Sequence, residues 1–180
     1  DSRIKASLGF ANGMQERIRE LEMPHAVFEV KIVESVDYEY YGKDNVNLYF
    51  SANQNVPSRE LSKVASGGEL SRIMLCLKAV LARGKGMPTM IFDEIDTGVS
   101  GSIADKMGTL IGDLSGYMQV FAITHLPQIA SKGECHLLVY KENRSGSTIT
   151  KIKKIENDER IMEIARMLSG KELTQAAIAN

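Results

Sequence analysis

The chain has 180 residues, of which 43% are hydrophobic, 25% charged and 6% aromatic, a composition typical of a globular protein with a packed core. Its formal net charge of −1 argues against a generally basic nucleic-acid binder, so any DNA-binding surface has to be local. Two cysteines, Cys76 and Cys135, cannot make a disulfide framework and indicate a reducing, cytoplasmic location. No apolar run reaches the ~20 residues of a membrane span, so no membrane contact is expected.

The first half of the chain predicts two helices and a pair of strands. Residues 3–21 combine charged side chains with a thin apolar stripe and predict a polar helix. Residues 26–34 and 46–50 alternate apolar with polar side chains, which predicts two antiparallel strands. Residues 51–63 have loop composition, and residues 68–83 predict a second helix. We expect the buried face of that second helix to comprise Leu70, Ile73, Met74, Leu77 and Leu81.

The second half alternates short apolar runs with helical patterns, which predicts a parallel α/β core. The expected elements are strands over 89–92, 119–124 and 136–140, a helix over 102–114, a further strand over 148–154 and a closing helix over 161–168. The strand over 89–92 is uniformly apolar apart from its first residue, so we expect it to be buried on both faces.

A glycine-rich segment opens the second helix. Ser66 and Glu69 have the spacing of a capping box, in which each satisfies a free amide of the first turn. Gly67 and Gly68 are not explained by a cap, since each glycine costs roughly 1 kcal/mol against alanine in a helix interior. Bare amides at the positive end of a helix also let an anion approach closely. The sequence alone leaves both a helix cap and a phosphate site open.

Polar residues follow two of the predicted strands at the point where each ends. Asp93 and Glu94 come directly after the run 89–92, and His125 comes directly after 119–124. Adjacent residues on a strand face different directions, so one carboxylate can hold a hydrated Mg²⁺ while its neighbour orients a water. Taken singly, each pattern also fits a strand that simply runs out into solvent or a structural histidine. Their order along the chain is more informative than any one of them.

That order resembles the signature, Walker B and switch-histidine motifs of ABC-type ATPases in the form used by SMC-like proteins. Residues 63–77 (KVASGGELSRIMLCL), 91–101 (IFDEIDTGVSG) and 123–133 (ITHLPQIASKG) resemble the RecN family of bacterial DNA-repair proteins more closely still. The likeness continues through 167–180 and loosely back to Pro24. It implies an α/β fold that is the C-terminal lobe of an ABC/SMC-type P-loop ATPase head. Its sheet is expected to be mainly parallel and flanked by helices, with a small antiparallel portion.

The resemblance also implies roles for the residues after the strands. The cofactors are ATP and Mg²⁺, with Asp93 supporting the metal through water. Glu94 is the implied general base, and His125 senses the γ-phosphate. The segment from Asp96 to Ser100 corresponds to the D-loop. Ser100 stands where the wider ABC pattern has aspartate, which weakens the transfer of that role.

The glycine-rich segment takes a role in trans by the same resemblance. Ser66, Gly67, Gly68 and Glu69 would meet the γ-phosphate of ATP held by an opposing head. Ala65 stands where many signature motifs have leucine, in agreement with RecN-like sequences.

The chain is expected to be one half of a head. A P-loop needs Gly-x-x-x-x-Gly-Lys-Ser/Thr, and the residues that follow the three Gly-Lys pairs of this chain are Asp44, Gly86 and Glu172. We therefore expect a piece of a longer protein, in which residues 1–22 end a coiled-coil arm and residues 23–180 form the C-terminal lobe. The implied partners are the N-terminal head lobe of the same polypeptide, a second head in an ATP-dependent dimer, and DNA. The implied setting is double-strand break repair and recombination at the bacterial nucleoid.

Three other functions fit parts of the sequence. Asp96-Thr97-Gly98 is the tripeptide of aspartic proteases, and an obligate homodimer of such a protease needs only one copy per chain. His125, Cys135 and His136 are zinc-ligand types, although their spacing matches no common zinc pattern. A non-catalytic interaction domain that keeps the fold is the third alternative, and a general base such as Glu94 is dispensable for it.

Overall fold

The computed structural model describes residues 2–40, 42–64, 66–144 and 147–169. In chain order its elements are α1 (Ser2–Glu20), β1 (Val27–Glu39), β2 (Gly42–Ser51), β3 (Arg59–Glu60), the 3-10 turn η1 (Leu61–Lys63), α2 (Gly67–Lys85), β4 (Thr89–Asp93), α3 (Gly101–Ser115), β5 (Gln119–Ile123), α4 (Pro127–Ala130), β6 (His136–Arg144), β7 (Ser147–Ile155) and α5 (Asn157–Ser169). No helix in these described ranges is long and apolar enough to cross a membrane.

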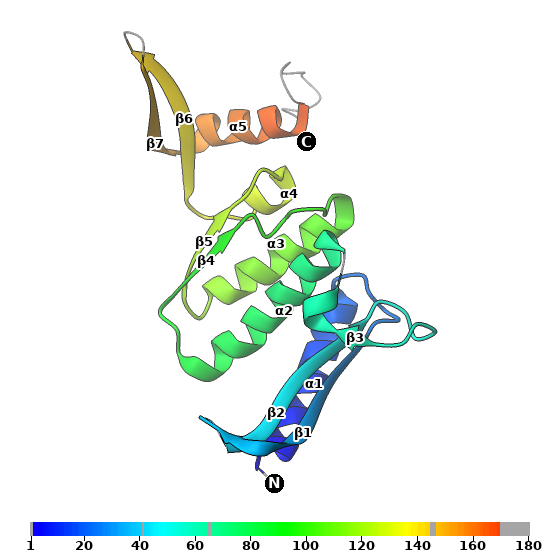
Figure 1. Ribbon diagram of the computed structural model, residues 1–180. Helices are drawn as coiled ribbons and strands as arrows, with labels where there is room; N and C mark the ends of the chain where they lie inside the picture. The colour runs from blue at the N-terminus through cyan, green and yellow to red at the C-terminus, as the bar shows by residue number, and fades with distance from the viewer. Residues whose placement is uncertain (1, 41, 65, 145–146, 170–180) are drawn as a thin grey trace.

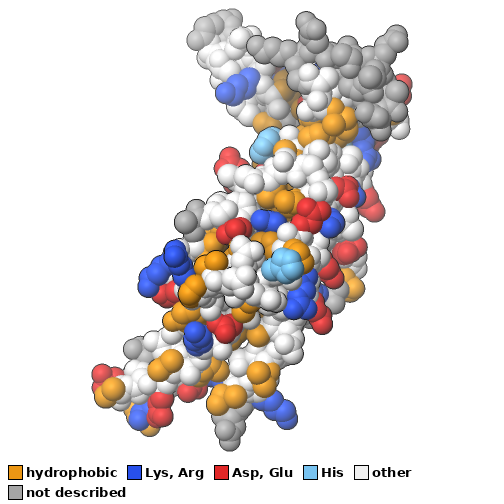
Figure 2. All heavy atoms as spheres, turned by 90° about the vertical axis from the view of Figure 1, so that its right-hand side faces the viewer, with side chains coloured by type: hydrophobic (Ala, Val, Ile, Leu, Met, Phe, Trp, Pro, Cys, Tyr) orange, Lys and Arg blue, Asp and Glu red, His pale blue; other side chains and the backbone are white. Residues whose placement is uncertain are grey.

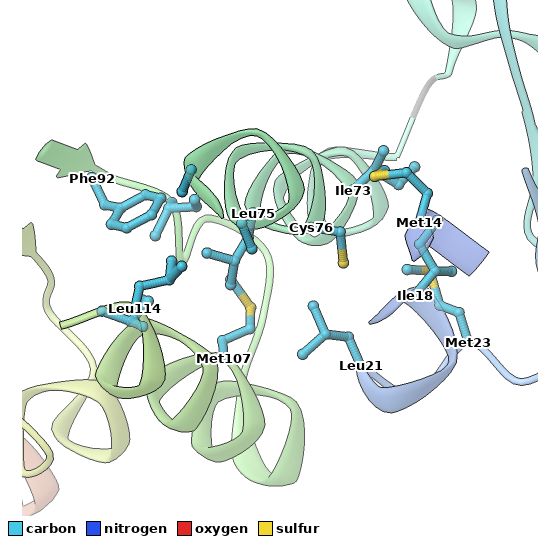
Figure 3. Close-up of a cluster of buried hydrophobic side chains, with 14 of the residues drawn as sticks. Met14, Ile18, Leu21, Met23, Ile73, Leu75, Cys76, Phe92, Met107 and Leu114 are labelled. Atoms are coloured by element: carbon cyan, nitrogen blue, oxygen red, sulfur yellow. The ribbon is translucent and has the colours of Figure 1, made fainter. Parts of the chain in front are cut away.

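The main core lies where α1, α2, α3 and β4 meet, and Figure 3 shows its side chains. Ile18 from α1, Ile73 from α2, Phe92 from β4 and Met107 from α3 are all fully buried. Burial of one such side chain contributes about 1.5–3 kcal/mol. The helices that carry the sequence motifs are therefore fixed to one another by a shared apolar core.

The strands form three separate sheets in the described residues. In the first, β1 and β2 pair antiparallel, as predicted, with Val27 opposite Ser51, and β3 adds to the edge of β2. In the second, β4 and β5 pair in parallel, as predicted. In the third, β6 and β7 form an antiparallel hairpin in which His136 lies opposite Ile155.

The expectation of a third parallel strand over 136–140 is wrong for this chain. That segment belongs to β6, which pairs only with β7 among the described residues, so parallel pairing is confined to β4 and β5. An apolar run predicts a strand but carries no information about its direction or its neighbour. The expected mixture of parallel and antiparallel sheets is present, whereas the expected predominance of parallel pairing is not.

The buried face of α2 differs from the predicted one. Ile73 is buried as expected, but Leu70 and Leu81 are exposed. The side chains of Leu75, Cys76 and Ala79 are buried instead. Leu75 and Cys76 lie on the part of α2 that faces α1 and α3 (Figure 3), and all three of these side chains belong to the main core. The periodicity predicted the helix but not all of the residues on its contact face.

The parallel sheet β4–β5 is covered on one face only. Met90 and Phe92 point into the core, while Ile91 between them is 59% exposed. On β5, Phe121 lies opposite Ile91 in the register, and both Phe121 and Ile123 are exposed as well. In Figure 1, α2 and α3 lie together on one side of these strands. The prediction that the strand over 89–92 is buried on both faces is therefore wrong for the chain by itself.

Candidate functional site

The parallel register of β4 and β5 brings the predicted strand-end residues together. Asp93 lies directly opposite Ile123, so Glu94 and the pair Thr124–His125 leave neighbouring strands at the same edge of the sheet. The side chains of Asp93, Glu94 and His125 are all exposed there. Ligands of open parallel α/β sheets bind at this edge, beyond the carboxyl ends of the strands. The predicted placement of Glu94 and His125 at adjacent strand ends is confirmed.

Glu94 has an unusual backbone conformation. Its φ is 49°, in the left-handed region that a residue with a Cβ rarely adopts. The turn that follows maintains this conformation, because the Thr97 amide and the Thr97 hydroxyl both donate to the Glu94 carbonyl oxygen, at 3.3 and 2.9 Å. Such strain is found mostly at functional positions, where the surrounding structure compensates for a cost of about 1–3 kcal/mol.

Asp96 anchors the same turn from inside the protein. Its Oδ2 accepts a hydrogen bond from the Thr124 hydroxyl and a second one from the His125 backbone amide, at 3.2 Å. The Thr124 Oγ1 in turn accepts from the Leu126 amide at 3.0 Å. The His125 Nδ1 lies 3.4 Å from the same Asp96 oxygen, although the imidazole is mostly exposed. The ends of β4 and β5 are thus joined by side-chain hydrogen bonds as well as by the strand ladder.

The glycine-rich segment begins α2, with Ser66 as its N-cap. The Glu69 amide donates to the Ser66 hydroxyl at 3.4 Å, so the cap that the sequence left open is present. The two glycines then differ sharply. A Cβ added to Gly67 would meet no atom within 4 Å, whereas a Cβ added to Gly68 would lie 2.5 Å from the Gly98 carbonyl oxygen. Gly67 leaves an open helix start, and Gly68 is required for packing.

The start of α2 and the turn after β4 form one packed unit. We call residues 94–100 the strand-end turn. Gly98 of this turn, at a φ of 76°, lies against Gly68, and the Ser71 hydroxyl donates to the Thr97 carbonyl oxygen at 3.3 Å. The glycine-rich segment, the acidic pair and the histidine therefore lie in one continuous region of the surface.

Comparison with curated proteins identifies the family of the chain. The DNA repair protein RecN of Halalkalibacterium halodurans is 38% identical over 96% of this chain, and those of Vibrio cholerae and Streptomyces coelicolor are each 36% identical over 99% and 100% of it. The chain belongs to the RecN family. It spans only about a third of the length of these relatives, with 31%, 32% and 34% of them covered. No protein-family model matches this chain.

Solved structures show the fold of this RecN-family chain. The Smc head domain with a coiled coil and joint from Pyrococcus yayanosii matches 93% of the chain and 30% of its own, with a TM-score of 0.70 at 14% identity. A structure from work on ATP-driven dimerization and DNA-stimulated activation of SMC ATPases matches 95% of the chain and 98% of its own, with a TM-score of 0.64 at 16% identity. The predicted SMC-type head fold is confirmed.

The residues of this RecN homologue fit ATP and Mg²⁺ in part. Gly67 is exposed with open space beside it at the positive end of α2, which favours an anion, and the exposed carboxylate of Asp93 offers one oxygen ligand to a cation. Within the described ranges no cluster of three or more histidine, cysteine, aspartate or glutamate side chains could hold a metal by itself.

The two other site hypotheses find no support in the described RecN-family structure. His125, Cys135 and His136 do not form a metal-binding cluster. His136 is partly buried, and this burial, aided by repulsion from Arg160, lowers the pKa of its imidazole. The Asp96 carboxylate is buried and hydrogen-bonded to Thr124, so it is not presented to a substrate as a protease carboxylate must be.

Sequence reasoning missed two features of this site. They are the left-handed backbone conformation of Glu94 and the hydrogen bond by which Asp96 anchors Thr124.

Proposed function

We propose that this chain is the C-terminal lobe of the ATPase head of a RecN-type DNA-repair protein. In this proposal residues 1–22 end a coiled-coil arm and residues 23–180 form the lobe. The observation that carries it is the exposure of Asp93, Glu94 and His125 together at the carboxyl ends of two hydrogen-bonded parallel strands. The packed start of α2 beside them and the RecN family membership support it.

The strand-end residues perform the chemistry in this proposal. Glu94 accepts a proton from the attacking water and orients that water toward the γ-phosphate. His125 would donate from its imidazole to a γ-phosphate oxygen, and Asp93 would hold Mg²⁺ through water. The metal, when bound, neutralises charge on the phosphates. Because these side chains are exposed and compete with solvent, closure of a second surface over them is required to exclude bulk water.

The start of α2 supplies that second surface to another head. Ser66 and Gly67 are exposed at the positive end of a 19-residue helix. No atom lies within 4 Å of a Cβ built on Gly67, so there is space beside this residue for a phosphate of ATP held on an opposing head to approach the helix start. Gly68 and Glu69 complete the first turn. Two heads would therefore enclose ATP between them, and the active form is an ATP-dependent dimer.

The N-terminal head lobe of the same polypeptide is the proposed partner of the β4–β5 sheet. Exposed Ile91, Phe121 and Ile123 form an apolar face, and a soluble domain normally covers a contiguous face of this kind. That lobe also supplies the P-loop, so the chain alone is expected neither to bind ATP tightly nor to hydrolyse it.

DNA is a proposed partner of the whole protein rather than of one surface in this chain. On the face shown in Figure 2, acidic and basic side chains are interspersed, and the described residues form no basic patch there. A bacterial cytoplasmic location at the nucleoid, with a role in double-strand break repair and recombination, belongs to the same proposal.

The test combines the chain with its N-terminal head lobe. We expect the mixture to hydrolyse ATP and the chain alone to show no micromolar ATP affinity by calorimetry. Replacement Glu94→Gln in the mixture should abolish turnover and leave ATP binding intact. If the mixture binds ATP and DNA but wild type and Glu94→Gln hydrolyse equally slowly, the lobe is a non-catalytic interaction domain. Micromolar ATP binding by the chain alone would contradict the half-site assignment.

A further inference from the structure

Asp96 is the only charged residue that is fully buried in the described part of the chain. A buried carboxylate loses its hydration, which costs several kcal/mol unless hydrogen bonds compensate for the loss. Its Oδ2 has donors, as described above, while its buried Oδ1 has no hydrogen-bond partner among the described residues. A carboxylate kept in this position at such a cost calls for an explanation beyond packing.

The hydrogen bonds of Asp96 all lead to the segment that carries His125. One Asp96 oxygen accepts hydrogen bonds from both the Thr124 hydroxyl and the His125 amide. The Leu126 amide donates a hydrogen bond to the same Thr124 hydroxyl. Three consecutive residues are therefore fixed by one carboxylate, directly or through one hydroxyl. The strand ladder between β4 and β5 ends at Asp93 and Ile123, so it cannot fix this segment.

The position of His125 is fixed mainly by the hydrogen bond of its backbone amide, because its imidazole makes few contacts. Its side chain is 73% exposed, and the nearest charged group is Asp96 Oδ2, 3.4 Å from Nδ1. An exposed imidazole samples several rotamers unless its attachment point is fixed and one ring nitrogen has a nearby acceptor. Asp96 supplies both constraints.

We propose that Asp96 is a positioning residue that acts inside its own chain: it fixes the segment from Thr124 to Leu126 and so orients the His125 imidazole. This role differs from a direct contact with the nucleotide of an opposing head, and it rests on the proposed function only where His125 is assigned to the γ-phosphate. Ser100 at the other end of the strand-end turn is exposed and keeps its D-loop assignment.

Asp96 cannot easily hold the segment from Thr124 to Leu126 and also contact the nucleotide of an opposing head, and the conformation of the turn explains why. The Val99 amide donates to the Asp96 backbone carbonyl oxygen at 3.2 Å, which fixes the backbone of the turn at Asp96. On the other side Gly98 lies against Gly68. Rotation of the Asp96 side chain toward solvent would break both bonds at Oδ2 and leave the Thr124 hydroxyl and the His125 amide without their acceptor.

The first test needs no ATP and uses amide hydrogen exchange of the 180-residue chain by NMR. Replacement Asp96→Ala should speed exchange of the His125 amide by about tenfold or more, since a bond to a charged acceptor is lost. Replacement Thr124→Val should speed exchange at Leu126 instead, with little change in side-chain volume. The Tyr117 amide, which donates to the Leu114 carbonyl oxygen, is the internal reference.

The second test measures ATP turnover by the full-length protein. Replacements Asp96→Ala and Thr124→Val should each lower kcat by about 10- to 100-fold, the effect of misplacing a catalytic group by ~1 Å, with KM for ATP changed less than about twofold. Thr124→Ser keeps the hydroxyl and should retain the wild-type kcat. Thr109→Val removes an exposed threonine hydroxyl from α3 and serves as the matched control.

Each result decides the proposal. Unchanged exchange at His125 in the Asp96→Ala variant would overturn it, and so would faster exchange with a normal kcat, which would leave Asp96 a purely structural residue. A raised KM or a weaker ATP-dependent dimer with normal single-turnover rates would assign Asp96 to the opposing nucleotide instead. If the wild-type protein shows no ATP turnover, the proposed function fails, and the exchange experiment alone decides whether Asp96 positions the His125 segment.

Discussion

The start of α2 and the ends of β4 and β5 lie in one region but are built differently. At the start of α2 the important features belong to the backbone: open space beside Gly67 and a close backbone contact at Gly68. At the strand ends the important groups are exposed side chains, Glu94 and His125, held by a turn beneath them. Substitutions should therefore affect chemistry at the strand ends, and assembly or stability at the start of the helix.

The largest effect is expected at the strand ends. Replacement Glu94→Gln in the full-length protein should lower ATP turnover by about 10² to 10⁴-fold, the usual loss when a general base is removed. Its midpoint of thermal unfolding should stay close to wild type, because the exposed side chain contributes little packing. Glu134→Gln, another exposed glutamate, is the control. A Glu94→Gln variant with wild-type turnover would remove Glu94 from the catalytic assignment.

The next largest effect is expected on assembly. Replacement Gly67→Asp places a carboxylate where a γ-phosphate would dock, so it should weaken ATP-dependent dimerization by about 100-fold. Folding should be preserved, since no atom lies within 4 Å of an added Cβ. Sedimentation with and without ATP measures both. Gly112→Asp, at an equally open glycine of α3, should dimerize normally, and equal dimerization of the two variants would contradict a docking role for Gly67.

A matched pair of alanine replacements tests the contrast between the two glycines. Gly68→Ala should lower the free energy of unfolding by about 1–3 kcal/mol, because its Cβ would lie 2.5 Å from the Gly98 carbonyl oxygen. Gly67→Ala should be neutral or stabilising by up to about 1 kcal/mol. Urea unfolding of the chain measures both. Equal destabilisation by the two replacements would show that the Gly68–Gly98 contact does not limit the packing.

The smallest effect is expected at the helix cap. Replacement Ser66→Ala removes the acceptor of the Glu69 amide and should lower the free energy of unfolding by about 1 kcal/mol. Ser66→Asp keeps a cap and should retain stability, yet it adds a negative charge beside the proposed phosphate position and should weaken the ATP-dependent dimer. If Ser66→Asp dimerizes like wild type, the cap is the whole role of Ser66.

The sequence predicted the elements and the order of the site better than its internal geometry. Motif order placed Glu94 and His125 at neighbouring strand ends, because parallel strands joined by a helix end at the same edge. The Asp96–Thr124 hydrogen bond joins residues 28 positions apart, and no local sequence pattern predicts it. The left-handed φ of Glu94 was equally hidden, since glutamate gives no signal for that conformation.

The errors in the fold have related causes. Hydrophobic periodicity describes one segment, whereas the partner of β6 and the contact stripe of α2 depend on what packs beside them. Leu70 and Leu81 fit the helical pattern, yet Leu75, Cys76 and Ala79 are the residues that pack in the core. The exposed Ile91 was read as buried because its run is apolar, although in this chain one face of its sheet is uncovered.

The left-handed backbone at Glu94 matters to anyone who would engineer this protein for heat resistance. Glycine at that position removes the strain of a left-handed conformation, and asparagine tolerates this conformation better than glutamate does. A screen that selects only for survival of heating would therefore enrich such replacements, and every clone it recovered would lack the carboxylate. Libraries built on this scaffold should hold position 94 constant and select on turnover and melting temperature together.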